Sequence, residues 1–252
     1  MKTLTKLTGI LAVSALMLTA GAAKVQAQNE TTLSVFQTAK EDYFYVKCPV
    51  MTERYGCAVI GKTNGYKSKS FATNPLNKIK EINNSKKTVD WVTVTPNGKW
   101  IIVYDNGKQI SYSSGFTTGH AGFFDELKDI KARNVTMVWA VADDIGNFLI
   151  KYKRSDGTFG YKYNNNMNSS IIDIFKRNGW KVKSVYMSNS GWVVTYNDNH
   201  VEYIGTVPQA VKDHISKFLK MYSTNISSIA FTDMGYVVIV YEGMCFWNWG
   251  VG

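Results

Sequence analysis

Four tryptophans are the side chains in this sequence that are best suited to hold a ligand: Trp91, Trp180, Trp247 and Trp249. They stand outside the repeated apolar positions of the chain, and an exposed indole can stack on a sugar ring or anchor a protein partner. Trp247 and Trp249 have an alternative role, which is to seal the last part of the fold against the first. Together with His120, which lies in a stretch rich in Gly and Thr, these tryptophans are the predicted ligand contacts.

The sequence offers few residues for catalysis. Its three histidines, His120, His200 and His214, are widely separated and lack the spacing of metal ligands. It contains no Gly-x-Ser-x-Gly elbow, no His-Glu-x-x-His motif and no P-loop. We therefore predict no catalytic residues and no cofactor, and we expect His214 to lie on the exposed face of a helix.

The unrepeated acidic pair of the chain is Asp143-Asp144, which falls in an expected turn. The pair is the candidate for a metal site, but Ca²⁺ takes six to eight oxygen ligands, so we predict that no metal is bound. The enzymatic alternative, a glycosidase or lyase, needs two opposed carboxylates. It would require a cluster of unrepeated Asp, Glu or His residues to line a common cavity, and the candidates are Asp143, Asp144, His120 and Glu202.

The elements that would position these residues come from one segment that recurs along the chain. Its copies are led by aromatic residues that lie 48, 44 and 44 residues apart: Trp100, Phe148, Trp192 and Tyr236. Each copy contains an apolar-alternating strand, a turn, a strand that is apolar on both faces, a second turn and a weaker third strand. We expect the lead aromatics in the core, because they recur in the doubly apolar strand. We expect positive φ at three glycines of the first turn: Gly98, Gly191 and Gly235.

The N-terminal region fits the same pattern as a diverged first copy, which gives five βββ units of about 44 residues. Their expected ranges are 40–71, 89–115, 135–164, 182–205 and 226–252. Amphipathic helices are predicted between successive units, at 75–84, 123–132, 170–177 and 208–222. The sequence therefore predicts a mainly β fold with helices between the units, formed by residues 28–252 as a single repeat domain.

The chain resembles β-propeller proteins in its repeat length, its three-stranded meander and the Gly-aromatic start of the second strand. It carries neither a WD dipeptide nor a kelch pair of glycines, and a helix stands where the fourth strand of a blade would be. The resemblance implies a propeller-like ring, and the alternative is an open, curved βββα stack.

The N-terminal 27 residues have the pattern of a bacterial secretory signal peptide. Lys2 and Lys6 form a positive start, an apolar stretch follows, and Val25-Gln26-Ala27 supplies a cleavage site. The apolar stretch is shorter than the roughly 20 residues that a spanning helix needs. We therefore expect cleavage after residue 27, export to the periplasm or outside the cell, and no transmembrane segment after signal removal.

Charge and cysteine content set further bounds on the partners and the compartment. The net charge of +10 at pH 7 falls to +7 without Lys2, Lys6 and Lys24. No compact run of five basic residues occurs, so we predict no nucleic-acid partner. An oxidising compartment would permit one disulfide, with the pairing left open among three residues: Cys48, Cys57 and Cys245.

These features favour an exported, non-catalytic binding or scaffold protein that recognises a glycan or a protein ligand. One alternative is a hydrolase, either a glycosidase or a lyase, on a propeller-like scaffold. The other is a structural component of the cell envelope. The sequence leaves the oligomeric state open.

Overall fold

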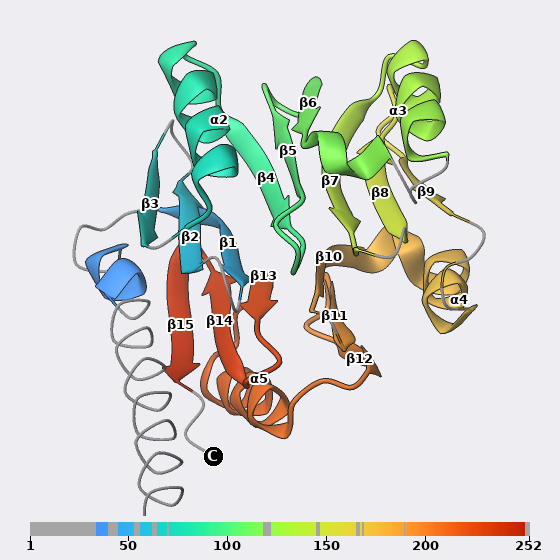
Figure 1. Cartoon of the computed structure of the whole chain (residues 1–252). Helices are drawn as coiled ribbons and strands as arrows, with labels where there is room; N and C mark the ends of the chain where they lie inside the picture. The colour runs from blue at the N-terminus through green and yellow to red at the C-terminus, as the bar shows by residue number, and fades with distance from the viewer. Residues whose placement is uncertain are drawn as a thin grey trace, which may run out of the picture.

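The computed structural model shows a mainly β protein made of small antiparallel sheets (Figure 1). It describes residues 34–39, 45–52, 56–61, 65–69, 71–117, 122–144, 147–164, 167, 169–188 and 190–249. The expected signal peptide, residues 1–27, and the loop residue His120 lie outside these ranges. None of the described helices is long and apolar enough to cross a membrane.

Five three-stranded sheets follow one another along the chain, and each is a meander of three consecutive strands. We number them as units 1 to 5. Unit 1 comprises β1 (Val46–Thr52), β2 (Gly56–Gly61) and β3 (Tyr66–Lys69). Unit 2 comprises β4 (Val89–Val94), β5 (Trp100–Tyr104) and β6 (Gln109–Tyr112). Unit 3 comprises β7 (Thr136–Ala142), β8 (Phe148–Lys153) and β9 (Phe159–Tyr163).

The last two units have the same composition as the first three. Unit 4 comprises β10 (Val182–Met187), β11 (Gly191–Tyr196) and β12 (Val201–Gly205). Unit 5 comprises β13 (Ile226–Phe231), β14 (Tyr236–Tyr241) and β15 (Met244–Trp249). The predicted five-fold repetition of a three-stranded antiparallel unit is confirmed.

One α-helix follows each of the first four sheets in chain order. These helices are α2 (Thr73–Asn84), α3 (Phe123–Ala132), α4 (Ser169–Asn178) and α5 (Gln209–Met221). Short 3₁₀ turns lie at η1 (Ser114–Thr117) and η2 (Gly179–Lys181), and residues 34–39 are also helical. Each α-helix buries one apolar stripe, as its amphipathic pattern requires.

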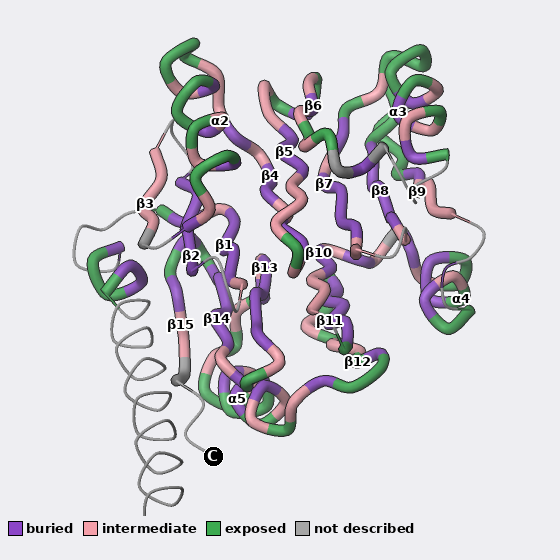
Figure 2. Tube along the Cα trace, in the orientation of Figure 1, coloured by how far each residue is buried: buried purple, intermediate pink, exposed green. Residues whose placement is uncertain are grey.

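The middle strand of each unit is buried at its centre on both faces. Ile101, Ile102 and Val103 of β5 have no exposed surface, although their side chains point alternately to opposite faces of the sheet. Figure 2 shows such buried stretches throughout the interior of the molecule. A strand that is apolar on both faces requires cover on both faces, and one three-stranded sheet cannot supply it.

All five first strands carry a register shift at the same place. The shifts lie between Val46 and Cys48, Val89 and Trp91, Met137 and Trp139, Val182 and Ser184, and Ile226 and Ser228. Such a bulge increases the local twist and leaves one residue of the strand unpaired. The first strands are therefore equivalent in geometry as well as in sequence position.

Neighbouring units meet through these first strands. In order, β1 contacts β4, β4 contacts β7, β7 contacts β10 and β10 contacts β13, while β13 also contacts β1. A shared apolar cluster joins the first and last units, and Val59 of β2, Val238 and Val240 of β14 are among its members.

One type of hydrogen bond recurs at three of the junctions. The backbone N–H that precedes the bulge donates to the turn between the second and third strands of the neighbouring unit. Met137 donates to the Gly107 carbonyl at 2.9 Å, and Ile226 donates to Asn199 Oδ1 at 3.2 Å. Val46 of unit 1 donates in the same way to the Gly243 carbonyl of unit 5 at 2.8 Å.

Gly191 departs from its predicted backbone conformation. Gly98 and Gly235 have φ of 81° and 88°, as expected, but Gly191 is not among the described residues with positive φ. It begins β11, and a Cβ there would lie 2.7 Å from the carbonyl oxygen of Thr206. Glycine is needed at this position because another part of the backbone approaches closely.

The three cysteines are free thiols, and all of them are buried. The Cys48 Sγ lies 3.8 Å from the carbonyl oxygen of Val92 in the next unit. Burial raises the pKa of Cys48 and of Cys245 to about 12, which keeps both groups protonated at neutral pH.

His214 is buried, which corrects the expectation of an exposed helix position. It lies with Val211, Ile215 and Phe218 on the apolar stripe of α5, and its ring stacks on Phe246 at 4.5 Å between centroids. Burial, with the nearby charge of Lys217, lowers the pKa of His214 to about 4. Its Nε2 has no hydrogen-bond partner among the described residues. The folded protein therefore holds a neutral imidazole.

This burial makes stability depend on pH in the acid range. An unfolded histidine has a pKa of about 6.5, so between pH 6.5 and 4 the unfolded chain takes up a proton that the folded chain excludes. The stability that the neutral His214 contributes to the folded protein is fully present above pH 6.5 and is lost as the pH falls towards 4. The free energy of unfolding is measured in urea at pH 7.5 and at pH 4.5 for the wild type and for His214→Phe. Between these two pH values, the wild type should lose on the order of 2 kcal/mol more than the variant does. Equal losses in the two proteins would contradict a buried neutral His214.

Candidate functional site

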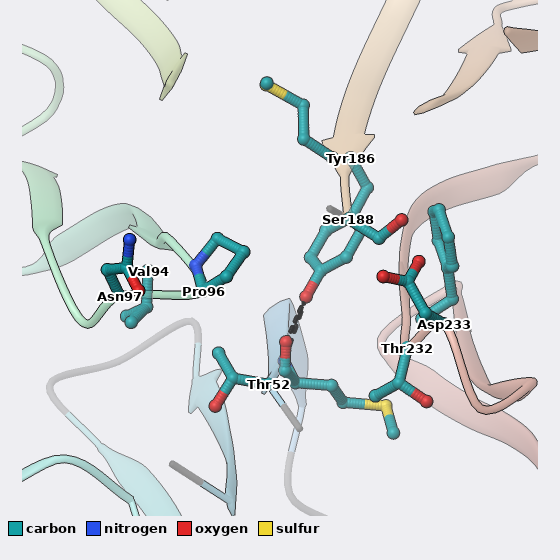
Figure 3. Close-up of a pocket in the computed structure, with 11 residues that line it drawn as sticks. Thr52, Val94, Pro96, Asn97, Tyr186, Ser188, Thr232 and Asp233 are labelled. Atoms are coloured by element: carbon teal, nitrogen blue, oxygen red, sulfur yellow. Dashed lines mark hydrogen bonds between the residues drawn. The ribbon is translucent and has the colours of Figure 1, made fainter. Parts of the chain in front are cut away.

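A cavity of about 170 Å³ lies where the first strands end (Figure 3). Four units contribute to its wall. Unit 1 supplies Met51 and Thr52, and unit 2 supplies Val94, Pro96 and Asn97. Units 4 and 5 supply the remaining residues, which run from Tyr186 to Ser188 and from Phe231 to Asp233. Each contribution comes from the end of a first strand and the start of the turn after it.

Tyr186 reaches from unit 4 to unit 1. Its hydroxyl donates to the carbonyl oxygen of Met51 and accepts a longer bond from the Met51 N–H at 3.4 Å (Figure 3). Its ring packs against Phe231 at 5.4 Å between centroids. Units 1 and 4 are not consecutive in the chain, so this side chain fixes the relative position of two separate turns and bounds the cavity on one side.

The polar groups of the wall are held in place by their own turns. Ser188 Oγ accepts from the Gly191 N–H at 3.2 Å, and Thr232 Oγ1 accepts from the Tyr236 N–H at 3.3 Å. Asp233 Oδ1 accepts from Ser190 Oγ at 2.5 Å, which links the turns of units 4 and 5. The wall thus combines hydroxyls, the Asn97 amide and one carboxylate with apolar surface from Met, Val, Pro and Phe side chains. Such a mixture suits recognition by hydrogen bonds and contact.

The Asp143-Asp144 pair makes turn and junction bonds beside this cavity but does not line it. Asp144 accepts from Thr95 Oγ1 at 2.5 Å and from the Asn97 N–H at 2.9 Å, which links the turns of units 2 and 3. Asp143 accepts from the Asn147 N–H at 2.8 Å and thereby closes its own turn. Within the described ranges, no group of three or more His, Cys, Asp or Glu could hold a metal ion.

Glu202 lies elsewhere, on the outer strand β12. It accepts from the Tyr196 hydroxyl at 2.9 Å and lies 3.4 Å from His200 Nε2. The structure does not bring Glu202 together with Asp143 and Asp144 in this cavity, and the remaining member of the set, His120, lies outside the described residues.

Two of the predicted ligand tryptophans, Trp91 and Trp247, have described side chains, and neither lines the cavity. Trp91 is 8% exposed, packs near Trp139 at 6.4 Å and donates from Nε1 to Thr93 Oγ1 at 3.1 Å. Trp247 is partly buried and lies 6.2 Å from Phe36 of the helical segment 34–39, an arrangement that favours packing. Trp180 is in η2 and Trp249 ends β15, but their side chains are outside the described part.

The residues that line the cavity could have been found from the repeat itself. All of them sit at the end of a first strand or in the turn that follows, so the alignment of the copies places them at one level. What sequence reasoning missed is that these turns converge, because that depends on how the units pack side by side. Asn97, Ser188 and Asp233 otherwise look like ordinary turn formers.

Lys151 is the buried lysine whose pKa is most clearly displaced. It is 4% exposed, lies 4.3 Å from the ring centroid of Phe159, and donates to the Val182 carbonyl. Burial lowers its pKa to about 8. Lys151 belongs to β8 and Val182 to β10, so this bond joins units 3 and 4. A structural role therefore explains the buried environment of Lys151.

Comparison with known proteins gives no family. No family model and no curated protein matches the chain. The crystal structure of human WBSCR16 is 10% identical, with a TM-score of 0.34 over 78% of this chain and 61% of that one. The structure of selenomethionine-substituted virginiamycin B lyase from Staphylococcus aureus is 9% identical, with a TM-score of 0.27 over 78% and 63%. The chain thus spans less than two thirds of either protein, and function must be argued from its own residues.

The bond from Tyr186 to Met51 can be tested by removing one atom. Tyr186→Phe should lower the free energy of unfolding by about 1 kcal/mol, because the buried Met51 carbonyl loses its donor. Tyr203→Phe is the control, since Tyr203 lies on β12 with 36% of its surface exposed. Urea unfolding of both variants measures the difference, and identical stabilities would contradict a Tyr186 bond between units 1 and 4.

Proposed function

We propose that this chain is an exported, non-catalytic binding protein, built as a closed five-unit propeller-like ring, whose glycan or protein ligand enters the cavity at the ends of the first strands. The observation that carries the proposal is the convergence of short polar side chains from four units on one cavity. Export rests on the pattern of residues 1–27.

The equivalence of the junctions supports closure of the ring. The bond from Val46 to Gly243 relates unit 1 to unit 5 as the bond from Met137 to Gly107 relates unit 3 to unit 2. An open stack would leave unit 1 and unit 5 as uncovered ends. The apolar cluster shared by β2 and β14 favours the ring instead.

The form of the cavity supports binding of a small part of a larger ligand. Its volume of about 170 Å³ lies below the 300–1,000 Å³ that is typical of sites for drug-sized molecules. One sugar ring or one protein side chain is the kind of group that such a cavity admits. The carboxylates at or beside it, Asp233 and Asp144, already accept bonds that hold turns together, which suits positioning more than proton transfer.

Hydrogen exchange tests the closed ring. The Val46 and Met137 amides occupy equivalent places, so in a ring both should exchange slowly and with similar protection. NMR-detected exchange on the chain from residue 28 onwards measures both amides in one experiment. A Val46 amide that exchanges like a free amide, while Met137 stays protected, would favour the open stack.

Ligand screening tests the cavity. The same protein is screened against a glycan array and against a display library of proteins with varied surface loops. Any ligand that binds saturably is then titrated against three variants. Asn97→Ala and Asp233→Asn alter the cavity wall, whereas Asp173→Asn makes a matched charge change on the exposed side of α4. We expect Asn97→Ala and Asp233→Asn to weaken binding by about tenfold, or roughly 1.4 kcal/mol, and Asp173→Asn to bind as the wild type does. Binding that none of the three changes would place the ligand elsewhere.

A further inference from the structure

A second concave surface lies in unit 4 between β12, with the turn before it, and α5. This groove is broad and open to solvent, with a volume of about 570 Å³. None of the residues that line it also lines the cavity at the first strands. It is therefore a separate candidate for recognition.

One wall of the groove is an unpaired strand edge. β12 is the outer strand of its sheet and pairs only with β11. The bonds from the Tyr196 N–H to the His200 carbonyl at 3.0 Å and from the Thr206 N–H to the Ser190 carbonyl at 2.8 Å set the phase of the ladder. Antiparallel pairing alternates, so Glu202 and Ile204 bond to β11, while the N–H and C=O groups of three residues point outward: Val201, Tyr203 and Gly205.

These outward groups have no hydrogen-bond partner within the described ranges. Val201 and Tyr203 follow the two-residue spacing of an extended strand, and Gly205, whose φ is 69°, ends the extended part of β12. An edge of this kind is a template for another chain, and natural proteins usually block it with charge, proline or cover. Here the groove leaves room beside it.

The other wall of the groove is one face of α5. Lys212, Ser216 and Leu219 follow one another at helical spacing along this face. Lys212 Nζ lies 5.6 Å from the ring centroid of Tyr203, and Leu219 is partly buried. Lys220 adds a second positive charge, whereas Asp213 accepts from Gln209 Nε2 at 2.8 Å. The groove thus combines the Tyr203 ring and the Leu219 side chain with a wall in which Lys212 and Lys220 outnumber the one carboxylate, Asp213.

We propose that this groove binds an extended, acidic peptide segment of a protein partner, which adds to β12 as a fourth strand of unit 4. The backbone of the peptide would bond to Val201, Tyr203 and Gly205, and its acidic side chains would face Lys212 and Lys220. A glycan does not supply N–H and C=O groups at the repeat of a strand. A second copy of this chain carries the same positive net charge, +10 in full and +7 without Lys2, Lys6 and Lys24, which opposes pairing of two such edges.

The test begins with a phage-displayed library of random twelve-residue peptides. Peptides are selected on the wild-type chain and counter-selected on Lys212→Glu, and the enriched peptides are synthesised and titrated. We expect them to be rich in Asp and Glu and to bind Lys212→Glu about fivefold more weakly than the wild type. Lys217→Glu, an identical charge change on an exposed residue of α5 outside the groove, should bind as the wild type does. Equal melting temperatures of the variants confirm that each is folded.

Backbone methylation of the peptide then distinguishes strand addition from simple charge attraction. N-methylation at every second residue, in the phase that faces β12, should weaken binding by about tenfold, and methylation in the other phase should not. Binding that is insensitive to both patterns would overturn the proposal. So would a library that yields no peptide dependent on Lys212, or a wild-type dimer that the selected peptide fails to dissociate.

Discussion

The structure depends on one constraint, which is that the middle strand of every unit is buried on both faces and almost entirely apolar. β11 is buried along its whole length, and the central residues of β5 have no exposed surface. A three-stranded sheet has only two faces and no second layer of its own, so each unit must borrow cover from its neighbours. Helices cover part of this surface, and adjacent sheets cover the rest. Side-by-side packing of the units is thus a consequence of strand composition.

That packing brings the ends of the first strands together and so creates the cavity. The described turn residues that follow β4, β10 and β13 carry little of the core, which leaves their residue types free to differ. Polar bonds between turns then fix them, as Thr95 and Asn97 do with Asp144, and as Ser190 does with Asp233. The repeated part of each unit therefore supplies stability, and the variable part supplies a polar surface that is specific to this chain.

Local sequence pattern predicted the strands well, because alternation and turn chemistry act within about ten residues. It was less informative where distant segments meet. Gly191 owes its identity to the approach of Thr206, and Trp91 is covered by Trp139 of the next unit, which the pattern of one repeat does not reveal. His214 is different, since it lies between Val211 and Phe218 on the apolar stripe of α5, and its burial could have been predicted from that spacing. The convergence of turns at the cavity required knowledge of the packing.

The absence of a fourth strand from each described sheet has a consequence for recognition. A third strand such as β12 offers backbone groups on its outer side, whereas the cavity offers side chains on turns. Backbone groups can pair with any extended chain, so the selectivity of the peptide site proposed at β12 would come from flanking residues of α5 such as Lys212 and Lys220. Side chains on turns differ from backbone groups in this respect. Each can be replaced without loss of the hydrogen bonds between the strands, so a turn can vary in what it presents. The two proposed binding surfaces would therefore draw their specificity from different physical sources, backbone groups with flanking charges at β12 and side chains on turns at the cavity.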